Sequence, residues 1–219
     1  MPSFRHLLKT REQRRQYDRS NAVSSIPVRV SPRLRRAVEL LERCLDDAAR
    51  QTKCGRVELR RTQELAQTVS DELCRTLRVR LPSVKVRGKR PLNSTGELHG
   101  LFTTGPSRED CIQVWMLTAK RQQVVKFKTF LRTLLHEVCH HLDYVFLGLR
   151  DSFHTDGFFR RESSLVHQLL RPKAEAARAD VPAAIEWRPH DDAFGARSAT
   201  FRADRGKRRV KFENVDDYS

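Results

Sequence analysis

The segment from Lys120 to Leu149 combines a long helical pattern of apolar residues with an unusual number of titratable side chains. Its apolar residues recur every three or four positions, which is the spacing of one face of an α-helix. They are Phe127, Leu131, Leu134, Val138, Leu142, Val145 and Leu149. The pattern predicts one long core helix, and the polar groups within it need an explanation.

Shorter patterns on either side of this helix predict the rest of the fold. Ser31 can cap a helix that starts with Pro32 and that Gly55 would end. Alternating apolar and polar residues elsewhere predict short strands. The expected elements are helices over 31–55, 62–77 and 156–170 and strands over 83–88, 96–104 and 111–117. This order predicts an α+β domain over residues 31–171, with helices packed on a small three-stranded sheet.

The two ends of the chain differ in composition from this central domain. Residues 1–30 predict a flexible basic arm, and residues 172–219 predict a polar, largely disordered tail with a basic run over 202–212. The formal net charge of +16 favours acidic partners, with nucleic acid first among them. We expect non-specific, salt-sensitive phosphate contacts from the basic tails. Solvated tails without such a partner are the alternative.

The cysteines and the N-terminus indicate a cellular compartment. The 5 cysteines are odd in number and include no CxxC pair, which is typical of reduced thiols rather than of a disulfide framework or a zinc ribbon. The N-terminus lacks the apolar region of a secretory signal, and no run approaches the ~18 apolar residues of a membrane span. We therefore expect a cytoplasmic protein without a membrane partner, of undetermined oligomeric state.

The polar groups of the long helix form an HExxH motif, His136-Glu137-Val138-Cys139-His140. Residues four positions apart share one helical face, so both imidazoles can reach one zinc ion. In such a motif the glutamate does not bind the metal but can take a proton from a bound water. The motif predicts one catalytic zinc ion held by His136 and His140, with Glu137 as the general base.

A third ligand for this zinc ion has three candidates. His154 follows His140 by 14 positions, beyond Gly148, and a turn could bring it back over the ion. Glu162 would reach the ion from the next helix. Asp143 lies on the helix itself, three residues after His140, and a supporting role behind the ligands suits it better. We favour His154 over Glu162, and Asp143 least.

The segments LLHEVCHHLD and SFHTDGFFRR together resemble the SprT-like (Spartan-type) zinc metallopeptidases. That family has HExxH, a loop, and then a histidine followed shortly by glycine and an aromatic residue. The looser similarity upstream, in DELCRTLRVRLPSVKV, GELHGLF and CIQVWML, extends the resemblance to residues 60–170. It implies a zincin-like minimal metallopeptidase domain with His136, His140 and His154 as ligands and Glu137 as the base. Gly157 departs from the pattern, because the family glycine usually follows the third histidine directly.

The sequence therefore predicts a zinc metalloendopeptidase that hydrolyses protein or peptide substrates, among them DNA-associated proteins. The alternative is a DNA-associated binding or regulatory module that keeps the zinc site with little or no proteolysis. Three residues within or beside the motif have simpler interpretations. His141 is expected to pack rather than to bind metal, Cys139 to fill the core, and Tyr144 to pack rather than to stabilise an oxyanion.

Overall fold

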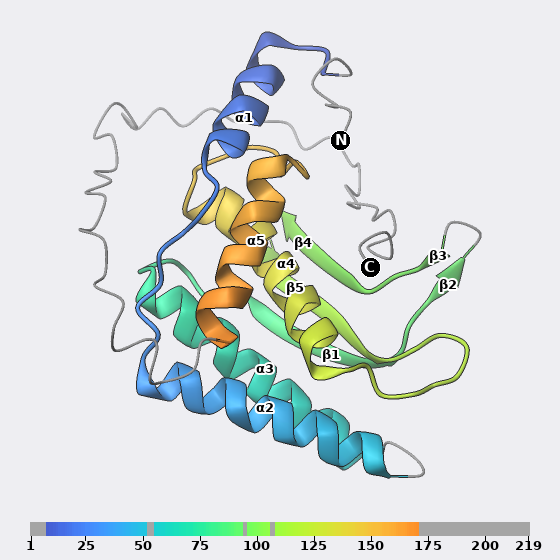
Figure 1. Ribbon diagram of the computed structural model, residues 1–219. Helices are drawn as coiled ribbons and strands as arrows, with labels where there is room; N and C mark the ends of the chain where they lie inside the picture. The colour runs from blue at the N-terminus through green and yellow to red at the C-terminus, as the bar shows by residue number, and fades with distance from the viewer. Residues whose placement is uncertain (1–7, 52–54, 94–95, 106–107, 171–219) are drawn as a thin grey trace. The chain divides into compact units, whose positions relative to one another are not determined.

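The computed structural model describes residues 8–51, 55–93, 96–105 and 108–170, which form an α+β fold (Figure 1). The helices are α1 (Arg11–Ala22), α2 (Pro32–Arg50), α3 (Arg56–Thr76), α4 (Phe127–Val145) and α5 (Asp156–Leu170). The strands are β1 (Ser83–Lys89), β2 (Leu92–Asn93), β3 (Gly96–Glu97), β4 (Gly100–Gly105) and β5 (Arg108–Leu117). The tail predicted over 172–219 lies outside the described residues. None of the described helices is long and apolar enough to cross a membrane.

Three strands form the main sheet, in the order β1-β5-β4. β1 runs parallel to β5, and β4 runs antiparallel to it, with Phe102 opposite Ile112. Strand β5 is central and buries Ile112 and Val114 completely, so β4 is left at the edge of this sheet. The strand predicted over 96–104 is divided, because β3 pairs with β2 in a separate hairpin and only β4 joins the sheet.

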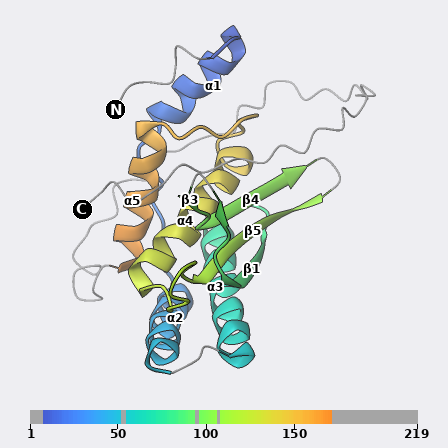
Figure 2. The same ribbon diagram turned by 90° about the vertical axis from the view of Figure 1, so that its right-hand side faces the viewer.

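Helix α4 lies between the sheet and α5, as Figures 1 and 2 both show. It therefore buries apolar side chains on more than one face, and six of them are at most 1% exposed: Phe130, Leu131, Leu134, Leu135, Val138 and Leu142. Burying one such side chain contributes about 1.5–3 kcal/mol. Helices α2 and α3 pack together, and α3 covers β1. The histidines and acidic residues of α4 consequently lie inside a packed core, whereas its Lys128 and Arg132 are exposed.

Helix α4 is shorter at both ends than the helix predicted over 120–149. The chain before it continues beside β5 instead, where the Val125 N–H donates to the Met116 carbonyl at 2.8 Å. After the helix, Gly148 has a φ of 62°, a left-handed conformation that favours glycine. This residue turns the chain back toward α5, which begins at Asp156 as the sequence predicts.

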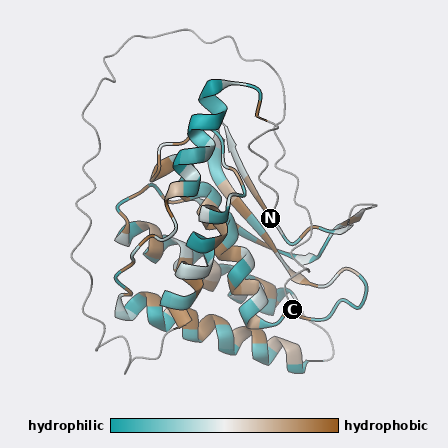
Figure 3. Cartoon of the chain, turned by 45° about the horizontal axis from the view of Figure 1, so that its top comes forward, coloured by the Kyte–Doolittle hydropathy of each residue, from teal (hydrophilic) through white to brown (hydrophobic). Residues whose placement is uncertain are grey.

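Residues 8–30 do not form the flexible arm expected for residues 1–30. Helix α1 begins with a capping box, in which Thr10 and Gln13 bind each other's backbone N–H groups. Helix α1 is largely hydrophilic in Figure 3, yet its Tyr17 and Ser20 are buried, and Ile26 beyond it is 1% exposed. The sequence did not reveal this because the inner face of α1 is mostly polar, and polar side chains bury only where tertiary hydrogen bonds satisfy them.

The junction between α1 and α5 allows a test of this packing. A Cβ atom added to Gly157 would collide with the backbone of Asn21, whereas one added to Gly88 meets no heavy atom within 4 Å among the described residues. We expect Gly157→Ala to lower the free energy of unfolding by about 1–3 kcal/mol, which is typical of overpacking. The control Gly88→Ala should change it by less than about 0.5 kcal/mol. Urea denaturation followed by circular dichroism measures both, and equal values would contradict the docking of α1.

Candidate metal centre

Three histidines converge between α4 and the loop that precedes α5. The Nε2 atom of His154 lies 3.1 Å from Nε2 of His136 and 3.0 Å from Nε2 of His140. One ring nitrogen of each histidine lies within 4.8 Å of the others, and this group of three could hold a metal ion. Two nitrogens that each lie about 2.0–2.1 Å from one tetrahedral zinc ion are roughly 3.3 Å apart. The spacing of the imidazoles is therefore close to that of a metal site.

Two of the three histidines of α4, His136 and His140, are oriented by hydrogen bonds to their Nδ1 atoms. His136 Nδ1 donates to a carboxylate oxygen of Glu162 at 2.7 Å. His140 Nδ1 lies 2.7 Å from the Ser152 hydroxyl, which in turn donates to Asp143 at 2.5 Å. Because that hydroxyl proton is directed to Asp143, the serine oxygen accepts from His140. Both rings therefore carry their proton on Nδ1 and direct the Nε2 lone pair to the centre, the form in which imidazole binds metal.

Burial keeps the imidazoles of His140 and His154 neutral. It lowers the pKa of His154 to about 3, with the nearby His136 as a second cause. It also lowers the pKa of His140 well below its usual value, assisted by His136 and His154. A metal ligand has to be deprotonated, and protons compete poorly for these two rings at neutral pH. The electrostatics of the cluster therefore favour metal binding.

Aromatic rings pack around the cluster. The Phe158 ring is completely buried, and its centroid lies 4.9 Å from that of His136, 4.7 Å from His140 and 5.1 Å from His154. Phe102 of β4 stacks on His140 from the sheet side, at 6.4 Å. Phe159 stacks on His154 at 5.6 Å and remains 40% exposed, and His154 itself is only partly buried. The side of the cluster formed by these last two rings therefore reaches solvent.

Glu137 lies between α4 and strand β4. Its carboxylate accepts a hydrogen bond from the backbone of Phe102, and Oε2 has no hydrogen-bond partner among the described residues. Burial raises the pKa of Glu137 well above its usual value, and the Glu162 carboxylate adds to the shift. A Cβ atom at Gly100 would collide with the Glu137 side chain, so β4 can pass this close only with glycine at that position. A buried carboxylate with an unsatisfied oxygen fits a place beside a cation or a bound water.

The other candidate ligands occupy supporting positions. Glu162 holds His136 and also lies 3.5 Å from the guanidinium of Arg132. Asp143 reaches His140 only through Ser152, the supporting role expected for it. Both ring nitrogens of His141 are engaged, one by Asp110 at 2.8 Å and one by the Arg80 carbonyl at 2.8 Å. His154 is thus the residue that the fold brings to the pair on α4.

The remaining neighbours of the motif pack as expected. Cys139 is 1% exposed and belongs to the hydrophobic core. The Tyr144 ring stacks on Phe102, with 5.8 Å between centroids. Sequence reasoning missed the Ser152 hydroxyl and the buried Arg161 behind Asp143. A serine two residues before His154 and an arginine inside the last predicted helix give no signal of their own, because each acts through tertiary contacts.

Comparisons with known proteins do not assign this centre. No protein-family model matches the chain, and neither a curated protein nor a solved structure matches it.

Because His154 and Glu162 occupy different positions around the cluster, substitutions at the two residues should reduce zinc affinity by different amounts. We expect His154→Ala to remove one of three ligands and to abolish stoichiometric zinc binding. Glu162→Gln keeps the shape of the side chain but weakens the hydrogen bond to His136, and should reduce zinc affinity by roughly 10- to 100-fold. Competition with a chromophoric chelator measures both constants. Complete loss of zinc in Glu162→Gln, with tight binding in His154→Ala, would show that Glu162 is the ligand.

Proposed function

We propose that this protein is a zinc-dependent peptidase of the SprT-like type, with Glu137 as the general base. One observation carries the proposal: three imidazoles direct nitrogen atoms to one point, and a buried carboxylate follows the first of them on α4. Neutral imidazole suits zinc, and three protein ligands leave a fourth position for water or substrate. This is the ligand number of catalytic zinc sites, because structural sites usually have four protein ligands.

The residues of the chain have separable roles in peptide hydrolysis. A bound zinc ion would polarise the scissile carbonyl and lower the pKa of a water molecule. Glu137 would accept a proton from the attacking water and return it to the leaving amine. Its raised pKa favours the proton-holding form that the second step uses, and a nearby cation would stabilise the carboxylate that the first step needs. Glu162 and Ser152 would keep the imidazoles oriented throughout.

Strand β4 and Phe159 indicate the kind of substrate. Among the described strands, β4 is an edge of the main sheet, and its Gly100 lies directly against Glu137. An extended peptide can add to such an edge through main-chain hydrogen bonds. The exposed ring of Phe159 beside His154 would then contact an apolar substrate side chain. We propose flexible or unfolded segments of proteins as substrates, because only an extended chain can pair in this way.

The basic character of the chain extends this proposal to DNA-associated proteins. Its net charge of +16 would concentrate the enzyme on nucleic acid through phosphate contacts. Exposed arginines on the outer helices add to this field; Arg33 of α2 and Arg60 of α3 have side chains that are 73% and 82% exposed. Arg33 and Arg60 also contact acidic side chains, so the surface is mixed rather than uniformly basic. A cytoplasmic location is part of the same proposal.

A second candidate function is a binding or regulatory module that holds zinc without proteolysis. The burial of Glu137, which is 1% exposed, favours it. If no water molecule reaches Glu137, this residue cannot act as a base, and the metal would then have a structural role. The two candidate functions differ in one expectation: removing the Glu137 carboxylate abolishes substrate cleavage in a peptidase, whereas in a binding module it changes only stability.

Glu137→Gln separates these candidates, because the amide keeps the shape of the side chain but cannot accept a proton as a base. For a peptidase we expect zinc binding to be retained and cleavage of an unfolded protein substrate to fall by roughly 10²–10⁴-fold. Cleavage is measured with wild-type and variant protein, in the presence and absence of single-stranded DNA.

Glu64→Gln on the exposed face of α3 is the matched control, and it should cleave as the wild type does. Equal cleavage by Glu137→Gln would contradict the role of Glu137. Zinc-loaded wild type that cleaves nothing under either condition would favour the binding module.

A further inference from the structure

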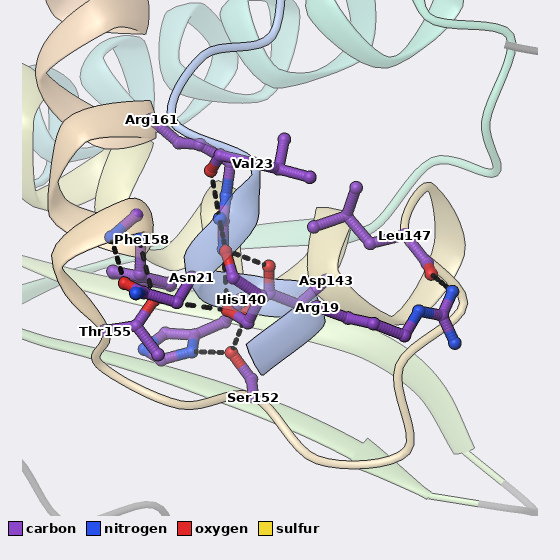
Figure 4. Close-up of polar contacts among 12 residues, drawn as sticks. Arg19, Asn21, Val23, His140, Asp143, Leu147, Ser152, Thr155, Phe158 and Arg161 are labelled. Atoms are coloured by element: carbon purple, nitrogen blue, oxygen red, sulfur yellow. Dashed lines mark hydrogen bonds and ion pairs between the residues drawn. The ribbon is translucent and has the colours of Figure 1, made fainter. Parts of the chain in front are cut away.

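Arg161 of α5 is a buried cation that joins α1 to the metal centre. It is 1% exposed, and its guanidinium donates to the carbonyls of Ser20 and Val23 at 2.5 Å each (Figure 4). It also donates to the Ser20 hydroxyl at 3.1 Å and to Asp143 at 2.7 Å. Unpaired backbone carbonyls are a feature of helix C-termini, and a cation is stabilised there. Arg161 thus binds the end of α1 through both terminal nitrogens, and its Nη2 also binds Asp143 of α4.

The same network continues to a metal ligand. The second oxygen of Asp143 accepts from the Ser152 hydroxyl at 2.5 Å, and the Ser152 oxygen accepts from His140 Nδ1 at 2.7 Å. Figure 4 shows this unbroken series of bonds from α1 through Arg161 to the imidazole. Ser152 belongs to the loop that carries His154, so two of the three histidines depend on the same contacts.

Helix α1 also holds that loop directly at several points. Arg19 donates to the Leu147 carbonyl in the loop at 3.0 Å, and the Asn21 side chain accepts from the N–H of Gly157, in the first turn of α5, at 3.0 Å. Between these points the Arg150 N–H donates to the side chain of Gln16 at 3.1 Å. The Tyr17 ring packs on Phe153, with 5.8 Å between centroids. The loop between α4 and α5 contains no strand or long helix, and α1 supplies much of its framework.

We propose that helix α1 contributes to the metal centre. When α1 is docked, it holds His140 and the loop that carries His154 in position, and it thereby sets the affinity for the metal ion. The inference rests on the proposed metal site and extends it to residues far from the motif in sequence. Arg161, Asp143 and Ser152 act as positioning residues. The coupling is reciprocal: if docked α1 raises the affinity for the metal ion, the bound metal ion stabilises docked α1 and the loop against opening by the same free energy.

The first test is the zinc affinity of the full chain, measured by competition with a chromophoric chelator. Ser152→Ala removes the acceptor for His140 and should weaken binding by roughly 10- to 100-fold. Arg19→Ala removes one hydrogen bond between α1 and the loop and should weaken it by roughly 2- to 10-fold. Arg15→Ala is the matched control, because its side chain is 63% exposed and pairs with Glu12 on the same helix. It should remain within about twofold of the wild type.

A second readout separates positioning from general loss of stability. Amide hydrogen exchange of the Arg150 and Gly157 N–H groups, both held by α1, should accelerate when zinc is removed from the wild type. Ser152→Thr, which keeps the hydroxyl, should recover most of the affinity lost in Ser152→Ala.

The outcomes distinguish the inference from the function on which it rests. Wild type that binds no zinc overturns both. Wild type that binds zinc, with Arg19→Ala equal to Arg15→Ala, overturns the role of α1 and leaves the metal site intact. Zinc-independent exchange at Arg150 and Gly157 also overturns it.

Discussion

Two hydrogen bonds behind the imidazoles of α4 fix the geometry on which the rest of the site depends. His136 is held by Glu162, and His140 is held by Ser152. Without these bonds each ring could rotate and present either nitrogen, and a cluster of three would have no defined centre. With them, both Nε2 atoms meet the ring of His154 at about hydrogen-bond distance. The arrangement requires α5 and the loop before it to return over α4, so the site forms only together with the fold.

The cost of this arrangement is a set of polar groups inside the core. Glu137, Asp143, Arg161 and Glu162 are each at most 3% exposed. Buried charges destabilise a protein unless partners satisfy them, and such pairs contribute little net stability compared with apolar packing. Arg161 and Asp143 satisfy each other, but one oxygen of Glu137 has no partner among the described residues. Local violations of core packing are expected at functional sites, and here they cluster around three imidazoles.

The sequence predicted those parts of the structure that depend on local patterns. The N-cap of α2, the strands β1 and β5, the start of α5 and the motif on α4 follow from spacing within short segments. The expected end of α2 at Gly55 was wrong, because α2 ends at Arg50 and Gly55 is the N-cap of α3. The sequence predicts a flexible arm in place of helix α1, because the inner face of α1 is polar and bonds mainly to residues more than a hundred positions away. Ser152 and Arg161 were missed for the same reason. The sequence leaves both Glu162 and His154 open as the third ligand. In the fold, Glu162 bonds Nδ1 of His136, whereas His154 lies next to its Nε2.

The X-ray absorption spectrum of the zinc-loaded protein at the zinc edge reports directly on the ligands of the metal. We expect one zinc ion per chain with three imidazole nitrogens at about 2.0–2.1 Å and one light-atom ligand from solvent. A sample that takes up no zinc would contradict this expectation, and so would a spectrum with two imidazoles and a protein carboxylate. The first result would mean that the convergence of His136, His140 and His154 serves packing rather than metal binding, and the second would replace His154 by a carboxylate as the third ligand.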